Sequence, residues 1–98
     1  MARNETLDLV AGAWTQATNA NITAIRVHNF GDCGVLRMQA TVGAVPPVSV
    51  SGSLPLDAGE TLAADLTLAE LWPGVVGANR LYLLAEKSGR VSVSHADG

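Results

Sequence analysis

The feature that most constrains the fold of this chain is an alternation of apolar and polar side chains with a period of two residues. It is clearest over residues 36–42, where four apolar residues alternate with three polar ones, and it recurs over 25–28, 62–68 and 90–94. Successive side chains of a strand point to opposite faces of a sheet, whereas a helix would mix both kinds of residue on every face. The pattern therefore predicts an all-β chain whose strands each bury one face.

Short turn motifs separate these runs at the close spacing that is typical of a sandwich or barrel. The clearest are Gly31-Asp32-Cys33-Gly34, Asp57-Ala58-Gly59 and Lys87-Ser88-Gly89. Connections this short cannot hold crossover helices, so the strands are expected to pair antiparallel. The predicted strands lie near residues 5–10, 13–17, 22–30, 34–42, 48–54, 60–68, 79–86 and 90–96.

One helical turn is expected at residues 68–72, because Pro73 and Gly74 follow it directly and end it. With 98 residues, the chain has room for a single core. We therefore predict one domain over residues 1–98. Its expected architecture is an antiparallel β-sandwich, jelly-roll-like, with about eight short strands in an order that the pattern leaves open.

The chain carries little charge. Charged residues make up 15% of the sequence, against about 25% in typical soluble domains. A surface of small neutral residues is suited to burial against other subunits, so self-association is expected. The alternative is an ordinary β exterior, since threonine and serine are common on the outside of small β domains.

Several classes of partner and location are disfavoured. The net charge is −3 and the six basic residues are scattered singly, which argues against a nucleic-acid partner. No apolar run approaches the ~20 residues of a membrane span, and residues 1–5 lack the apolar segment of a secretory signal. Synthesis in the cytoplasm is therefore expected. The single cysteine excludes an internal disulfide.

No catalytic, cofactor or metal site is predicted. His28 and His95 could share a metal ion with Asp32 or Asp97, but neither histidine lies in a short ligand motif, and a zinc site needs three or four ligands. Cys33 is interpreted as turn filler, because the neighbouring carboxylate of Asp32 disfavours a reactive thiolate. The chain is therefore predicted not to be an enzyme.

Four residues are candidate contacts with a partner or ligand. Trp72 lies with Val75 and Val76 in the longest irregular stretch of the chain, and Tyr82 lies in the strand that follows. Apolar side chains in surface loops are candidate interface residues. For Trp72, a plug of the core is the favoured interpretation, and a contact with a partner is the alternative. The other tryptophan, Trp14, is predicted to fill the core.

Five segments, in order along the chain, carry a resemblance to a known family. They are Trp14-Thr15-Gln16, the strand Ile22-Thr23-Ala24-Ile25-Arg26-Val27-His28-Asn29, the bend at Pro46-Pro47, the turn Leu54-Pro55-Leu56-Asp57-Ala58-Gly59-Glu60, and the terminal Val91-Ser92-Val93-Ser94-His95. Through them, nearly the whole chain resembles small virion proteins of tailed phages and phage-derived gene transfer agents. The resemblance implies a head decoration, spike or fibre-base protein, or else a tail part. It carries over no catalytic residues.

We therefore expect a non-enzymatic structural component of a phage-like particle, located in the virion and attached to the capsid. The expected partners are other copies of the chain and other virion proteins, such as capsid, spike or fibre subunits, and a host polysaccharide is compatible with this role. A carbohydrate-binding module is the first alternative, with Trp72 and Tyr82 as its aromatic platform. A small enzyme of the cupin kind is the second, although it would need more metal ligands than two histidines.

Overall fold

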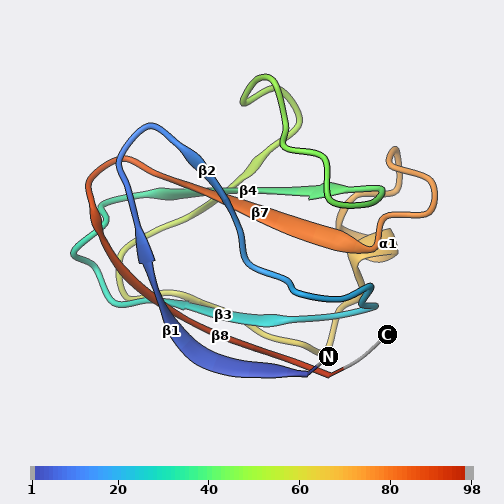
Figure 1. Cartoon of the computed structure of the whole chain (residues 1–98), viewed down its shortest axis with the longest axis horizontal. Helices are drawn as coiled ribbons and strands as arrows, with labels where there is room; N and C mark the ends of the chain where they lie inside the picture. The colour runs from blue at the N-terminus through green and yellow to red at the C-terminus, as the bar shows by residue number, and fades with distance from the viewer. Residues whose placement is uncertain (1, 97–98) are drawn as a thin grey trace.

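All but one of the regular elements are strands in the computed structural model, which describes residues 2–96 (Figure 1). Within these residues the elements are β1 (Arg3–Leu9), β2 (Trp14–Gln16), β3 (Arg26–Asn29), β4 (Leu36–Thr41), β5 (Leu54–Leu56), β6 (Thr61–Leu62), α1 (Leu68–Leu71), β7 (Arg80–Ala85) and β8 (Gly89–His95). The all-β class and the single helical turn are as predicted. In this part of the chain no helix has the length and apolar character needed to cross a membrane.

The strands form two layers, each a four-stranded antiparallel sheet, with the orders β1-β8-β3-β6 and β2-β7-β4-β5. The first four strands pair with the last four in nested fashion: β1 with β8, β2 with β7, β3 with β6 and β4 with β5. The chain is therefore a long double strand rolled into two facing layers, which is the eight-stranded jelly roll. The predicted antiparallel, jelly-roll-like sandwich is confirmed.

The period-two alternation places the apolar side chains between the two sheets. In β4, Leu36, Met38 and Ala40 are buried, while Arg37 is exposed on the outer face. The core residues supplied by the other long strands are Leu9, Val27, Leu81, Leu83, Ala85, Val91 and Val93. Trp14 is not one of them, so that prediction is wrong: it pairs with Leu84 on the outer face of its sheet and is half-buried.

Three predicted strands differ most from those observed. The third, expected at 22–30, is confined to Arg26–Asn29. The fifth was expected at 48–54 but forms at Leu54–Leu56, and the sixth, expected at 60–68, is confined to Thr61–Leu62. Residues 48–52 alternate valine with serine or glycine, yet they lie in a loop and all are exposed. Alternation alone does not make a strand, because a strand also needs a neighbour for its backbone hydrogen bonds.

The helical turn α1 is fixed at both ends. At its start, the Thr67 hydroxyl accepts a hydrogen bond from the backbone N–H of Glu70 (3.1 Å), and the Glu70 carboxylate accepts one from the N–H of Thr67 (3.2 Å), which together form a capping box. At its end, Trp72 donates to the carbonyl of Leu68 (2.8 Å), and Pro73 stops the helix. The turn buries Leu68 in the core.

Asn29, at the end of β3, is the most fully bonded polar side chain of the interior. It is completely buried, and its amide nitrogen donates to the carbonyls of Gly34 (2.8 Å) and Leu56 (2.9 Å). Its amide oxygen accepts from the N–H of Gly31 (2.9 Å). Its backbone adds a bond from the N–H of Asn29 to Glu60 (3.0 Å) and one from the N–H of Gly59 to Asn29 (2.8 Å). One residue therefore joins two of the corners at which the chain passes between the sheets, β3–β4 and β5–β6.

We predict that Asn29→Ala lowers the free energy of unfolding by roughly 3 kcal/mol, because it leaves two buried carbonyls and one N–H without their partner. Urea unfolding followed by tryptophan fluorescence measures this loss. Asn19→Ala is the matched control, since Asn19 is exposed. Equal stability of the two variants would contradict the role assigned to Asn29.

Candidate functional site

The most unusual surface feature is the loop of residues 42–53, which joins β4 to β5 and is called here the valine loop. It rises from the outer side of the sheet β2-β7-β4-β5 (Figure 1). Its valines are exposed to solvent: Val42 by 55%, Val45 by 63%, Val48 by 102% and Val50 by 51%. None of its twelve residues is charged, as the sequence from 42 to 53 shows.

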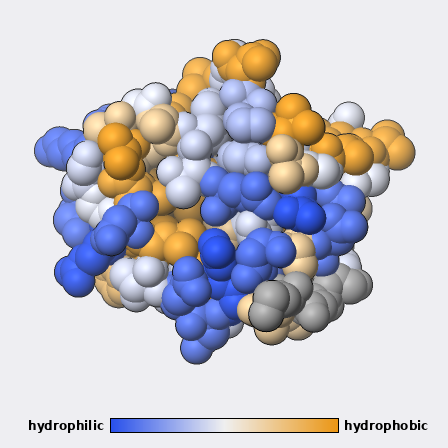
Figure 2. Space-filling view, in the orientation of Figure 1, coloured by the Kyte–Doolittle hydropathy of each residue, from blue (hydrophilic) through white to orange (hydrophobic). Residues whose placement is uncertain are grey.

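The turn of residues 75–78 adds to this apolar surface. Val76 is 88% exposed. The turn lies beside the base of the valine loop, since a Cβ placed on Gly77 would be 4.0 Å from a methyl carbon of Val42. In the space-filling view hydrophobic residues lie at the top and upper right of the molecule and also at its left and centre, whereas polar residues cover much of its lower part (Figure 2). Exposed apolar patches of this kind are typical of protein contacts.

Hydrogen bonds hold the valine loop at its base and leave its tip to solvent. On one side, the Asn79 amide oxygen accepts from the N–H of Gly43 (2.8 Å), and the N–H of Asn79 donates to Thr41 (3.0 Å). On the other side, the Trp72 indole N–H donates to the carbonyl of Gly52 (3.1 Å). The bonds from Val45 to Gly43 and from Ser53 to Val50 are local. The loop therefore projects from the sheet with its base held by hydrogen bonds and its apolar tip exposed.

The structure separates the four residues that the sequence marks as candidate contacts. Trp72 and Tyr82 are buried, with 5% and 4% of their surface exposed. The Tyr82 hydroxyl donates to the amide oxygen of Gln16 (3.1 Å). Val75 is half-buried against the core, and Val76 is open to solvent. Neither aromatic ring presents a face that a sugar could stack on, and Trp72 has the role of core plug that the sequence favoured for it.

An open groove of about 440 Å³ lies where Trp72 meets the valine loop. It is lined by Gln39, Ser51, Gly52, Leu71, Trp72, Pro73, Gly74 and Val75. The Trp72 side chain is buried and contributes little exposed surface to the groove. Ser51 and Gly52 belong to the valine loop, so the groove adjoins the apolar surface of that loop.

Sequence reasoning missed Val42, Val45, Val48 and Val50. The predicted strands 34–42 and 48–54 include Val42, Val48 and Val50 and would have given them a buried face, whereas Val45 lies between the two ranges. The signal that could have found them is the absence of charge over 42–53 together with the Pro46-Pro47 bend, since proline removes a donor from any ladder.

The outer face of the sheet β1-β8-β3-β6 is polar. His28 and the Thr61 hydroxyl share a hydrogen bond (2.7 Å), and Arg26 donates to Ser92 (3.2 Å). The Phe30 ring meets the His28 ring edge to face, with centroids 5.2 Å apart. These side chains contact one another, so their polar groups already have partners within the same face.

The candidate metal ligands do not come together. His28 lies on the outer face of β3, whereas His95 is buried at the end of β8, with its Nδ1 3.0 Å from the carbonyl of Ala96. Asp32 lies near Arg90 (3.8 Å), and Asp97 is outside the described residues. Between residues 2 and 96, no group of three or more histidine, cysteine, aspartate or glutamate side chains is placed to hold a metal ion.

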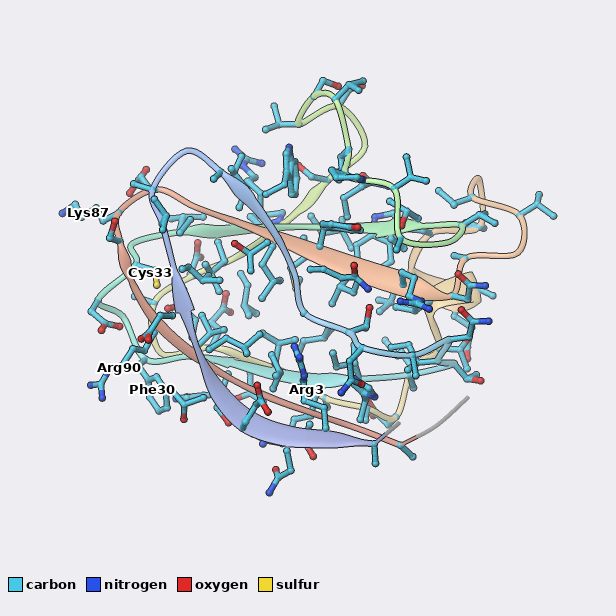
Figure 3. All side chains as sticks on the ribbon, viewed as in Figure 1. Arg3, Phe30, Cys33, Lys87 and Arg90 are labelled. Atoms are coloured by element: carbon cyan, nitrogen blue, oxygen red, sulfur yellow. The ribbon has the colours of Figure 1, made fainter. Side chains whose placement is uncertain are left out.

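Cys33 lies in the predicted turn, but its side chain is completely buried. It points between the layers, while Lys87 and Arg90 point outward at the same end of the molecule (Figure 3). Its thiol lies 3.6 Å from the carbonyl of Arg90. Burial raises the pKa of the Cys33 thiol, and the negative charge of Asp32 raises it further. The thiol is therefore held in its unreactive, protonated form.

Comparison with family models, with curated proteins and with solved structures found no significant match to this chain.

We predict that Trp72→Phe loosens the valine loop, because phenylalanine keeps most of the buried ring but cannot donate to Gly52. Loss of this one hydrogen bond should cost about 1 kcal/mol of stability. It should also speed cleavage between residues 42 and 53 by elastase, which cuts after small residues. Mass spectrometry of the fragments locates the cut. Tyr82→Phe, which removes a hydroxyl outside the loop, is the control and should leave the cleavage rate in the loop unchanged.

We predict that Cys33 in the folded chain reacts with a thiol reagent at least a hundredfold more slowly than in urea. The raised pKa also makes stability depend on pH, because the folded state favours the neutral thiol. The resulting contribution to stability is complete below the thiol's ordinary pKa of about 8.5 and is lost as the pH rises through the pKa of the folded state. Above about pH 8.5, the free energy of unfolding should therefore fall more steeply in the native chain than in Cys33→Ala. Parallel curves up to pH 10 would contradict the assignment.

Proposed function

We propose that the chain is a non-enzymatic structural component of a phage-like particle, and that it attaches to a capsid, spike or fibre subunit through the valine loop. The observation that carries the proposal is the exposure of five valines in the valine loop and the neighbouring turn, two segments that contain no charged residue. The resemblance to small virion proteins gives the context, and the jelly roll is a fold that capsid proteins share with lectins and cupins.

The size of the patch fits attachment by many copies. Burying one exposed valine contributes about 1.5 kcal/mol, so five contribute several kcal/mol. Association costs about 4 kcal/mol or more in lost freedom of movement. A single loop therefore supports a weak contact. Symmetric repetition on a particle converts such contacts into stable attachment, because each bound copy raises the effective concentration of the next.

The burial of Trp72 and Tyr82 bears on the carbohydrate-binding alternative. That function requires an exposed aromatic ring for the sugar to stack on. Phe30, which is 49% exposed, meets His28 and is separate from the valine loop. The apolar loop therefore supports contact with a protein better than contact with a glycan.

The proposal predicts that the chain is found in phage-like particles purified from cells that encode it. Replacing Val45 and Val48 by serine should reduce its copy number in the particles more than tenfold, since two valine contacts are worth about 3 kcal/mol. Quantitative mass spectrometry of the purified particles measures the copy number.

Val10→Ser is the matched control, because Val10 is 65% exposed but lies outside the valine loop. It should leave the copy number unchanged. All variants should have the same unfolding temperature as the native chain. Absence of the native chain from particles would refute the particle role. Normal incorporation of the double variant would refute attachment through the valine loop.

A further inference from the structure

The four edge strands of the sandwich are not equally protected. β6 has two residues, β2 has three, and β5 has three with Pro55 at its centre. Short edges and edge prolines are the usual protection against pairing with another chain. β1 differs: it has seven residues, contains no proline, and pairs with β8 without a bulge from Arg3 to Leu9.

The outer edge of β1 is open. β8 is its only ladder partner among residues 2–96, and no other described segment makes a hydrogen bond to the backbone of residues 3–9. Asn4, Glu5, Thr6 and Asp8 are exposed. A row of unpaired backbone N–H and C=O groups is a template for another strand.

We propose that β1 pairs with β1 of a second copy, antiparallel and around a two-fold axis, and joins the two β1-β8-β3-β6 sheets into one. An axis perpendicular to the sheet places one residue of β1 opposite its own counterpart. Side chains that are directly opposite then lie on the same face, as in any antiparallel ladder.

Charge selects the register. With Asn4 opposite Asn4, Arg3 lies opposite Glu5 of the second copy, and Glu5 lies opposite the second Arg3, which gives two ion pairs. With Glu5 opposite Glu5, two carboxylates face each other. With Thr6 opposite Thr6, both charged residues face leucines. Arg3 and Glu5 lie on the same face of β1, where Arg3 Nε is 3.7 Å from the Glu5 carboxylate and the Arg3 guanidinium donates to the carbonyl of Ala17 (3.2 Å). Charge therefore favours the register centred on Asn4, in which residues 3–5 of one β1 pair with residues 5–3 of the other.

Disulfide cross-linking tests the pairing and its register. Asn4→Cys, Thr6→Cys and Asp8→Cys each add one exposed thiol on the same face of β1, and the native Cys33 is buried. Opposite residues of an antiparallel pair have the Cα separation that a disulfide requires. Under mild oxidation, Asn4→Cys should form covalent dimers at least tenfold faster than the other two variants. Equal rates would refute specific pairing, and fastest cross-linking of Thr6→Cys or Asp8→Cys would refute the register.

A charge reversal gives an independent measurement. Glu5→Lys replaces both ion pairs by repulsion and should weaken dimerisation about tenfold in low salt, as measured by analytical ultracentrifugation. Unchanged dimerisation would overturn the register. The outcome is separate from the particle proposal, since the valine-loop variants leave β1 intact and should dimerise as the native chain does.

Discussion

The fold depends on the buried amide of Asn29. A jelly roll carries its chain back and forth between two sheets, and each crossing leaves backbone groups that no ladder satisfies. Asn29 supplies partners for such groups at Gly31, Gly34 and Leu56, which lie in or beside the connections from β3 to β4 and from β5 to β6. The Asn29 amide offers two N–H donors and one oxygen acceptor to these three backbone groups. An apolar residue of the same size would leave all three without a hydrogen-bond partner.

A second set of contacts joins the turn that contains Cys33 to the turn between β7 and β8. The N–H of Lys87 donates to the carbonyl of Cys33 (2.9 Å), and the Asp32 carboxylate accepts from the N–H of Arg90 (3.3 Å). The two turns approach so closely that a Cβ on Gly89 would lie 2.9 Å from the Cys33 sulfur. A glycine is therefore required at that position, and the cysteine is a packing residue. The valine loop takes no part in this closure, so its sequence is free to serve a contact.

Residue patterns predicted the parts of the structure that depend on local chemistry. The alternation over 36–42 gave β4, because it fixes which side chains share a face. The Ser88-Gly89 turn gave the break between β7 and β8, although these strands form no hairpin, because they lie in different sheets. The pattern failed at 48–54, where the alternation of valine and serine has no neighbouring strand to pair with. It also did not mark Asn29: the alternation places residue 29 on the face of Ile25 and Val27, but it does not show which backbone groups of other segments a buried amide would bond. The open edge of β1 was beyond sequence reasoning, because an edge is defined by the order of the strands.

The two surfaces proposed for contact reinforce each other through geometry. A two-fold axis perpendicular to the sheet β1-β8-β3-β6 leaves the second sheets of both copies on the same side of the joined sheet. The valine loop rises from the outer side of that second sheet, so a dimer paired through β1 presents both of its loops in the same direction (Figure 1). Two loops that reach one surface bind with an effective concentration that a single loop lacks, and bivalent attachment of this kind can exceed the single contact by about 10²-fold or more. The low charge of the chain has a physical explanation on this basis. Burying neutral, weakly hydrated side chains costs little free energy of desolvation. In the proposed dimer, the few charges at Arg3 and Glu5 set the register in which the two copies meet.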